Sequence, residues 1–368
     1  MSGIYIHIPF CPQKCNYCDF LSFENTGTGR MEQYVNALLA EIDALTSNDP
    51  KSGSVDVDTI YIGGGTPTAL PSSLLCKIVD AVRTPNPAEI TVEANPGTLT
   101  QKYLAEIKAH GVTRLSMGLQ TTKPHLLKTI NRIHTMQDFL VNYHTARKEG
   151  FGNINVDLMF ALPSQTLQDW QETLQEIIEL SPEHISAYSL TPAENTPLWD
   201  ALESGRIHLT NEETDRRMYH MARSILTKAG YIHYELSNFA KPGFHSRHNV
   251  NCWRRVPYRA FGLGAHSFDG QRRWCNTSNM DEYLAGCTST AIQQYLEVLT
   301  EADAQAETML LGLRLMEGVP EVNIPPIYKQ DIAEQIKKGL LTCVNGYVRL
   351  TPYGMDLANQ VFETFIVS

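Results

Sequence analysis

The chain has 368 residues, 42% of them hydrophobic, enough to fill the cores of one large α/β domain and a smaller second domain. Its net charge of −10 and lack of basic runs argue against nucleic acid or an anionic membrane as the main partner. Residues 1–20 lack the regions of a signal peptide, and no stretch of about 18 apolar residues occurs. We therefore expect a cytoplasmic protein without a transmembrane segment. The sequence predicts no particular oligomeric state.

Short β-rich runs alternate with amphipathic helical patterns through the first 230 residues. Strands are expected at 4–9, 59–63, 89–93, 114–120, 153–160 and 184–190, and helices at 31–45, 72–82, 101–110, 137–149 and 167–180. This alternation predicts parallel strands joined by right-handed crossovers. Six units favour a partial (β/α)6 TIM-like barrel over residues 1–230, with an open doubly wound sheet as the alternative.

Two further regions follow the barrel. We expect residues 231–300, which are rich in His, Arg and aromatic residues, to form an irregular connection. The pattern of residues 301–368 predicts a small winged-helix-like α+β domain. Its helices are expected at 304–316 and 328–338, followed by a hairpin across Asn345 and Gly346 and a last helix from Pro352. Because its charge is acidic, this domain is expected to pack or to contact a partner rather than to read DNA.

Three cysteines near the start indicate a metal site, because disulfides are not expected in a reducing compartment. Cys11, Cys15 and Cys18 form C-x3-C-x2-C directly after the first expected strand. Four protein ligands close a structural zinc site or an ordinary four-iron cluster, whereas three leave one metal site open. A zinc site would need a fourth ligand such as His7 or Asp19. A cluster with an exchangeable molecule on its fourth iron is favoured.

Polar residues and glycines end most of the other expected strands, at Gly63-Gly64-Gly65-Thr66-Pro67, Glu93, Gln120 and Tyr188, and the fifth strand carries Asp157. In barrels of this kind, active sites lie at the C-terminal ends of the strands. Taken singly, Glu93, Gln120 or Asp157 could equally cap the next helix or bind loop amides. Together they indicate one ligand-binding mouth. A phosphate loop is not favoured, since no Gly-Lys-Ser/Thr follows the glycines.

The cysteine motif, Tyr17 before the third cysteine and the glycine triplet together resemble the radical S-adenosylmethionine (radical SAM) superfamily. The resemblance implies a [4Fe-4S] cluster on Cys11, Cys15 and Cys18, with S-adenosylmethionine on the fourth iron. It also implies that one-electron reduction can cleave this molecule to a 5′-deoxyadenosyl radical.

Within the superfamily, the chain is most similar to the group of oxygen-independent coproporphyrinogen III dehydrogenase and HemW-like heme chaperones. The matching runs begin at Tyr5, Gly63, Glu93, Gly118, Asn131 and Asp157. By this resemblance, the positions that hold S-adenosylmethionine are Tyr5, Gly64, Gly65, Thr66, Glu93, Gln120, Arg132 and Asp157.

Two departures favour the HemW-like branch over the dehydrogenase. The dehydrogenase has one more cysteine where this chain has Phe20, and it carries a segment before the first strand where only three residues stand here. We therefore expect part of the decarboxylation apparatus to be absent. The resemblance then implies a heme chaperone that binds the cluster, S-adenosylmethionine and heme, and passes heme to acceptor apo-heme proteins.

A candidate heme site follows from the run His248 to Trp253, which resembles the H-N-x-x-Y-W motif of HemW-like proteins but has Cys252 at the tyrosine position. His248 is the expected axial ligand, and Cys252 is a second candidate. The alternatives are oxygen-independent coproporphyrinogen III dehydrogenase activity or another radical SAM modification of a tetrapyrrole. No residue is assigned a catalytic role, and enzymatic activity stays open.

Overall fold

The structure is a computed structural model that describes residues 3–47, 57–82, 89–289 and 292–366. Its main element is a 12-stranded sheet with the order β14-β13-β12-β11-β1-β4-β5-β6-β7-β8-β10-β9. The six central strands are parallel and follow one another in chain order: β1 (Gly3–Ile8), β4 (Thr59–Gly64), β5 (Glu89–Ala94), β6 (Arg114–Gln120), β7 (Ile154–Phe160) and β8 (His184–Ser189). The predicted partial barrel is confirmed.

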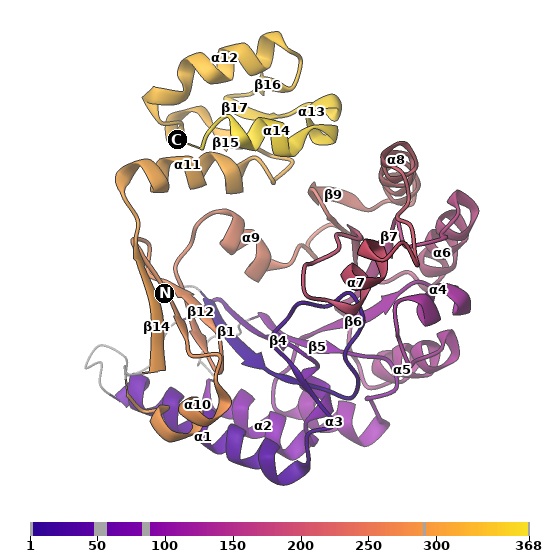
Figure 1. Cartoon of the computed structure of the whole chain (residues 1–368), viewed down its shortest axis with the longest axis vertical. Helices are drawn as coiled ribbons and strands as arrows, with labels where there is room; N and C mark the ends of the chain where they lie inside the picture. The colour runs from indigo at the N-terminus through magenta and orange to yellow at the C-terminus, as the bar shows by residue number, and fades with distance from the viewer. Residues whose placement is uncertain (1–2, 48–56, 83–88, 290–291, 367–368) are drawn as a thin grey trace.

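Amphipathic helices connect these strands and cover the outer face of the curved sheet (Figure 1). They are α1 (Thr28–Ser47), α2 (Ser72–Ala81), α3 (Gln101–Ala109), α4 (Pro124–Thr129), α5 (Met136–Lys148) and α6 (Leu167–Leu180), and α8 (Glu212–Lys228) follows the last of these strands. The short helix α7 (Pro197–Glu203) lies instead beside the cysteine loop, where the Leu198 N–H donates to the Asn16 carbonyl. Thr135 and Thr166 form capping boxes that start α5 and α6. The apolar sides of the strands, including Ile60, Val92 and Leu115, are buried in the main hydrophobic core.

Residues 231–300 are not irregular, so that expectation was wrong. At one edge, β10 (Asn238–Ala240) lies antiparallel to β8 and to β9 (Ile232–Glu235). At the other edge, β11 (Tyr258–Phe261) runs parallel to β1 and is followed by β12 (His266–Phe268), β13 (Arg272–Asn276) and β14 (Gln293–Val298). Helices α9 (Arg247–Trp253) and α10 (Met280–Gly286) complete the region. Phe239, Phe261 and Tyr283 belong to the same core as the barrel.

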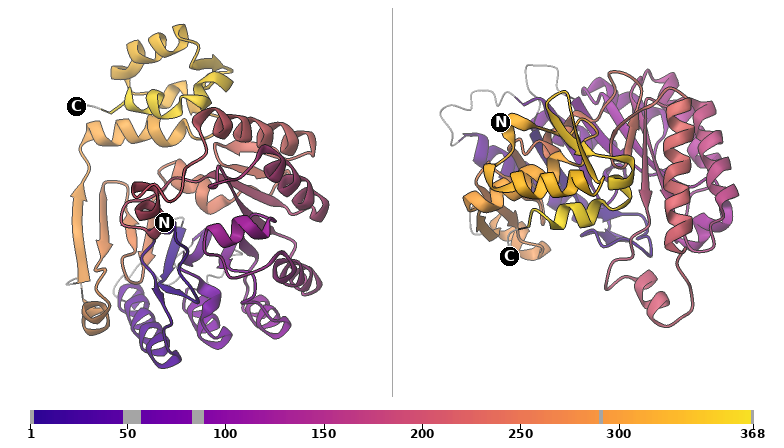
Figure 2. Two further views of the ribbon diagram at one scale, coloured as in Figure 1. Left: turned by 45° about the vertical axis from the view of Figure 1, so that its right-hand side comes forward. Right: turned by 90° about the horizontal axis from the view of Figure 1, so that it is seen from above.

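The C-terminal region has a core of its own, as expected for a winged-helix-like domain. It contains α11 (Glu301–Gly312), α12 (Lys329–Lys337), α13 (Pro352–Asp356), α14 (Ala358–Glu363) and a small sheet of β15 (Val319–Pro320), β17 (Tyr347–Leu350) and β16 (Leu341–Val344). Met309, Tyr328 and Phe365 are buried in this second core. The domain lies beside β9 and α8 (Figure 2), where Glu235 and Leu315 form a β-bridge.

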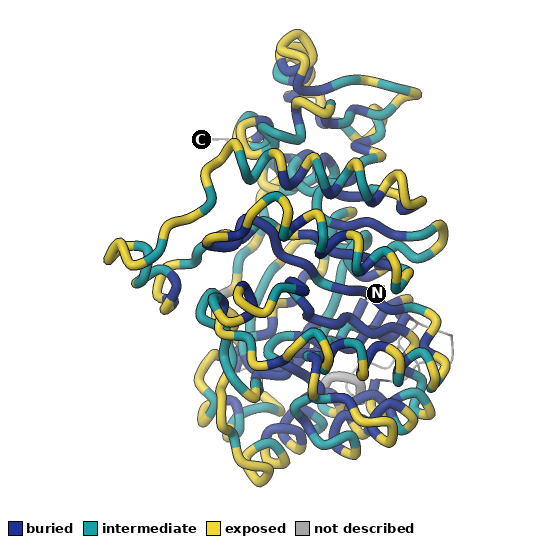
Figure 3. Tube along the Cα trace, turned by 90° about the vertical axis from the view of Figure 1, so that its right-hand side faces the viewer, coloured by how far each residue is buried: buried dark blue, intermediate teal, exposed yellow. Residues whose placement is uncertain are grey.

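The inner side of the parallel strands carries mostly polar side chains, unlike the packed aliphatic interior of a TIM barrel. We call this space the lumen and define it by Tyr5, Thr59, Tyr61, Glu89, Thr91, Glu93, Arg114, Ser116, Asn155, Asp157, His184 and Ser186. These residues alternate with the apolar ones along each strand. Figure 3 shows the buried strands in the middle of the molecule, beneath helices whose outer turns are exposed.

Candidate functional site

A cavity of about 370 Å³ opens at the C-terminal ends of the parallel strands. Ten residues expected from the sequence line it: Cys11, Cys15, Cys18, Gly64, Gly65, Thr66, Glu93, Gln120, Arg132 and Asp157. They come from the loop after β1, from β7, from the ends of β4, β5 and β6, and from the segment after α4, so the structure brings together elements far apart in the chain. We call this cavity the mouth pocket.

The cysteine loop is anchored on both sides of the mouth pocket. A two-residue ladder between β2 (Phe10–Cys11) and β3 (Phe23–Glu24) holds its ends. The Thr66 hydroxyl donates to Cys11 Sγ at 3.6 Å, and Arg132 Nη1 donates to Cys15 Sγ at 3.3 Å. Burial raises the pKa of the Cys18 thiol to about 11, so metal binding has to displace a proton there.

A zinc ion on the three cysteines of the loop would need a fourth protein ligand. His7, one candidate for a fourth zinc ligand, has both ring nitrogens engaged: Nδ1 with the Tyr5 hydroxyl at 3.0 Å and Nε2 with the Leu21 carbonyl at 2.9 Å. The zinc alternative therefore loses support.

Two glycines at the end of β4 allow the backbone to approach the cysteine loop. A Cβ on Gly65 would lie 2.7 Å from the Phe10 carbonyl oxygen and 3.0 Å from Cys11 Sγ. Gly64 has φ +111°, and a Cβ there would lie 2.6 Å from the His7 ring. Only glycine meets both conditions, so open backbone remains next to the sulfurs, which is what a ligand on an open iron would need.

Glu93 is the central carboxyl of the mouth pocket. Its Oε1 accepts a hydrogen bond from the Tyr61 hydroxyl at 2.7 Å, and its Oε2 accepts one from the Gly64 N–H at 3.1 Å. Burial raises the pKa of Glu93 to about 7, against the lowering effect of these two hydrogen bonds. The carboxyl therefore titrates close to neutral pH.

Arg132 reaches the pocket from the segment after α4. Besides Cys15, its guanidinium donates to Asn95 Oδ1 at 2.8 Å and to the Gly118 carbonyl. Gln120 lies nearby with φ +72°, where the pairing between β6 and β7 shifts its register. This irregularity lets the end of β6 turn its side chain toward the pocket.

Asp157 lies on β7 and is held by neutral donors. Its Oδ2 accepts from the Ser116 hydroxyl at 3.0 Å and its Oδ1 from Asn155 Nδ2 at 2.8 Å. Sequence reasoning missed Ser116 and Tyr61, which also line the pocket. Strand alternation could have found them, since each lies two residues before a glycine of the predicted mouth.

Two expected ligand-binding residues lie outside the mouth pocket. Tyr5 lies deeper, with its ring stacked 6.3 Å from that of Tyr61. His248 lies on α9 at the opposite end of the lumen, 6% exposed. Its Nδ1 is 3.0 Å from the Thr59 hydroxyl oxygen, at the start of β4, and its ring is 5.2 Å from that of Tyr61. The structure therefore places the candidate heme ligand at the floor of the barrel.

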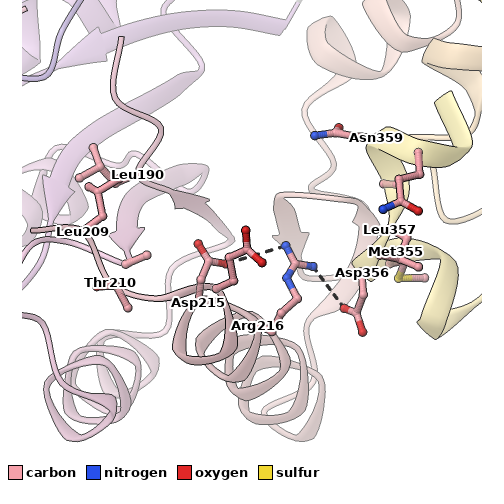
Figure 4. A pocket seen from close by; sticks show the side chains of 13 residues that line it. Leu190, Leu209, Thr210, Asp215, Arg216, Met355, Asp356, Leu357 and Asn359 are labelled. Atoms are coloured by element: carbon pink, nitrogen blue, oxygen red, sulfur yellow. Dashed lines mark hydrogen bonds and ion pairs between the residues drawn. The ribbon is translucent and has the colours of Figure 1, made fainter. Parts of the chain in front are cut away.

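A second cavity of about 640 Å³ lies between the barrel and the C-terminal domain (Figure 4). Ala161 and Leu190 line it, each two residues beyond a mouth-pocket residue on β7 or β8. Arg216 on α8 lies 3.3 Å from Asp356 of α13 and 3.9 Å from Asp215. This ion pair joins the two domains across the cavity. In the described part of the chain, no helix is long and apolar enough to cross a bilayer.

Comparison with known proteins matches both regions of the chain. Residues 5–177 match the model of the Radical SAM superfamily and residues 299–357 that of the HemN C-terminal domain. Heme chaperone HemW of Bacillus subtilis (strain 168) is 37% identical over 100% of this chain and 99% of its own length. HemW of Escherichia coli (strain K12) is 34% identical over 99% and 98%. The chain belongs to the HemW family.

A solved structure supports the fold of this HemW-family chain. Coproporphyrinogen III oxidase (HemN) from Escherichia coli, described as a radical SAM enzyme, superposes with a TM-score of 0.81 over 99% of this chain and 89% of its own. At 22% identity, this likeness shows the architecture alone. The family and the fold class predicted from the cysteine motif and the strand pattern are confirmed.

Proposed function

We propose that this HemW-family chain is a cytoplasmic heme chaperone. It binds a [4Fe-4S] cluster, S-adenosylmethionine and heme, and it transfers heme to acceptor apo-heme proteins. The observation that carries the proposal is similarity over the full length to proteins named heme chaperone HemW, at 37% and 34% identity. The acidic net charge agrees with a partner other than nucleic acid.

The residues of the mouth pocket fit the two cofactors of the radical SAM superfamily. Cys11, Cys15 and Cys18 would hold three irons, and the glycines leave open backbone beside the fourth. A cluster of this kind with S-adenosylmethionine supplies one-electron cleavage of the sulfonium. Polar groups around the pocket would orient the bound molecule: Thr66, Glu93, Gln120, Arg132 and Asp157, with Tyr5 supporting them from below.

Heme binding is assigned to α9, through His248 as axial ligand. Burial raises the pKa of Cys252 to about 11, so this thiol stays protonated at neutral pH and is the weaker iron ligand. Burial lowers the pKa of His248 to about 4, which keeps the imidazole in its neutral, metal-binding form. Because the His248 ring is buried against Thr59, ligation requires α9 to move away from β4. A short helix of 7 residues is a suitable element for such a movement.

Anaerobic reconstitution followed by heme transfer tests the proposal. The reconstituted protein is loaded with heme and mixed with apo-myoglobin, and the absorbance of the acceptor is followed over time. We expect saturable heme binding, weakened at least tenfold in His248→Ala with the cluster intact, and transfer to the acceptor. His110→Ala, which removes an exposed imidazole, is the matched control and should bind heme like the wild type.

A parallel arm distinguishes a chaperone from an enzyme. The same preparation is incubated with a reductant, S-adenosylmethionine and coproporphyrinogen III. Formation of protoporphyrinogen would overturn the chaperone assignment in favour of the dehydrogenase alternative. Cleavage of S-adenosylmethionine only in the presence of heme would instead favour modification of a tetrapyrrole. Absence of saturable heme binding would refute the carrier function itself.

A further inference from the structure

Arg114 is a buried cation that the functions described so far do not use. It is the first residue of β6, its side chain is 2% exposed, and it is among the largest fully buried side chains. Its Nε is buried and has no hydrogen-bond partner among the described residues. Guanidinium stays protonated in proteins, so this burial is costly unless charges nearby compensate it.

The register of the sheet places Arg114 directly below the mouth pocket. Thr91 pairs with Arg114 across β5 and β6, and Glu93 pairs with Ser116 two residues further along the same strands. Side chains two residues apart in a strand lie on the same face, about 6.6 Å apart along it. Arg114 therefore points into the lumen one layer below Glu93 and Ser116.

The carboxylates of the lumen are bonded to neutral donors rather than to Arg114. Glu93 accepts from Tyr61 and Gly64, and Asp157 accepts from Ser116 and Asn155. Glu89, at the floor, accepts from the backbone N–H groups of residues 247 and 248. The guanidinium thus acts on these groups through space, where the low dielectric of the interior strengthens the interaction.

Several groups together set the charge of Glu93. Burial and the Asp157 carboxylate raise its pKa, whereas Tyr61, the Gly64 N–H and Arg114 lower it. Burial lowers the pKa values of His184 and His248, and Arg114 adds to this effect, so both imidazoles stay neutral. The titratable or charged groups around Glu93 come from β1, β4, β6, β7 and the segment after α4. They are Tyr5, Tyr61, Arg114, Asp157 and Arg132.

We propose that Arg114 is a positioning residue of the mouth pocket, whose guanidinium supplies from one layer below the counter-charge for the Glu93 carboxylate that holds S-adenosylmethionine. The inference rests on the proposed function, because it assigns a role in binding that molecule. It explains why Glu93 is bonded to Tyr61 and Gly64 and not to this guanidinium: a direct ion pair would pull Glu93 down into the lumen and away from the ligand. Tyr61 and Gly64 fix the position of the carboxyl, and Arg114 favours its ionised form.

The test measures S-adenosylmethionine affinity against pH in the reconstituted protein. In the wild type, affinity should fall as the pH drops below about 7, where Glu93 becomes protonated. Arg114→Lys and Arg114→Met form a matched pair of similar size that differs in charge. The pH at which half of the affinity is lost should stay near the wild-type value in the Lys variant. In the Met variant it should rise by about one pH unit. In a Glu93→Gln background, the two variants should give the same flat profile.

The outcomes separate this inference from the proposed function. If the wild type binds no S-adenosylmethionine at any pH, the cofactor assignment fails and the inference fails with it. If the wild type binds and the Lys and Met variants share one midpoint, the inference alone is overturned. A Met variant that fails to fold while the Lys variant folds would show that the charge supports the fold, which also overturns a positioning role. Arg206→Met, at an exposed arginine, controls for the loss of net charge.

Discussion

Glu93→Gln should change how the stability of this protein depends on pH. The pKa of Glu93 is raised from the ordinary 4.5 to about 7, chiefly because the carboxyl is buried. In the unfolded chain the group ionises near pH 4.5, whereas the folded protein retains the proton up to about pH 7. The folded state therefore binds more protons in this window, and Glu93 makes the free energy of unfolding fall as the pH rises from 4.5 to 7. At 1.36 kcal/mol for each pKa unit, the total is about 3 kcal/mol.

Urea unfolding of the wild type and Glu93→Gln at several pH values between 4 and 8 measures this effect. Buried histidines such as His134 and His184 have lowered pKa values, so they make the free energy of unfolding rise with pH. This contribution is the same in both proteins and cancels when the two free energies are subtracted. The unfolding free energy of the wild type, relative to that of the variant, should fall by about 3 kcal/mol across the window. A difference that stays constant to within 0.5 kcal/mol, roughly the error of such measurements, would refute the reasoning.

Three further predictions concern the cysteine loop, the glycines and the domain contact. Cys15→Ala should abolish the visible absorption near ~400 nm that a thiolate-bound cluster gives; an unchanged iron and sulfide content would contradict the assignment. Gly64→Ala should lower the unfolding free energy by about 2 kcal/mol, because Gly64 has a φ of +111° and an added Cβ would meet the His7 ring. The control Gly29→Ala, at an exposed helical glycine, should not lower it. Equal urea midpoints for the two variants would refute this reasoning. Arg216→Met should cost at most about 1 kcal/mol because the ion pair is half exposed, yet it should speed proteolytic release of the C-terminal domain; an unchanged digestion rate would count against the domain contact.

The parallel barrel could be predicted because its signals are local. Each strand is a short β-rich run followed by an amphipathic helix, and the structure moves the expected strand limits by at most one residue at either end. The mouth pocket followed from the same pattern, since the C-terminal ends of parallel strands share one edge of the sheet. Glu93, Gln120 and Asp157 could be placed together without knowledge of any long-range contact.

The strands of residues 231–300 could not be predicted because long-range pairing stabilises them. Gly3 of β1 pairs with Tyr258 of β11, and nothing near Tyr258 in the sequence indicates this partner. The strands there are only 3 to 6 residues long, too short for a clear period. The same limit applies to His248. Its motif was visible in the sequence, but its burial against Thr59 depends on where α9 lies relative to β4.

The polar lumen has a thermodynamic consequence for the whole protein. Unfolding a barrel with an aliphatic interior exposes apolar surface on both sides of its strands, which raises the heat capacity, whereas exposure of polar surface lowers it. Here the apolar surface of the parallel strands lies mainly on their outer side, against the helices. The heat capacity change per residue should therefore lie below the usual ~12–15 cal/mol/K. A smaller value flattens the stability curve, so the barrel would keep a nearly constant margin of stability over a wide range of temperature.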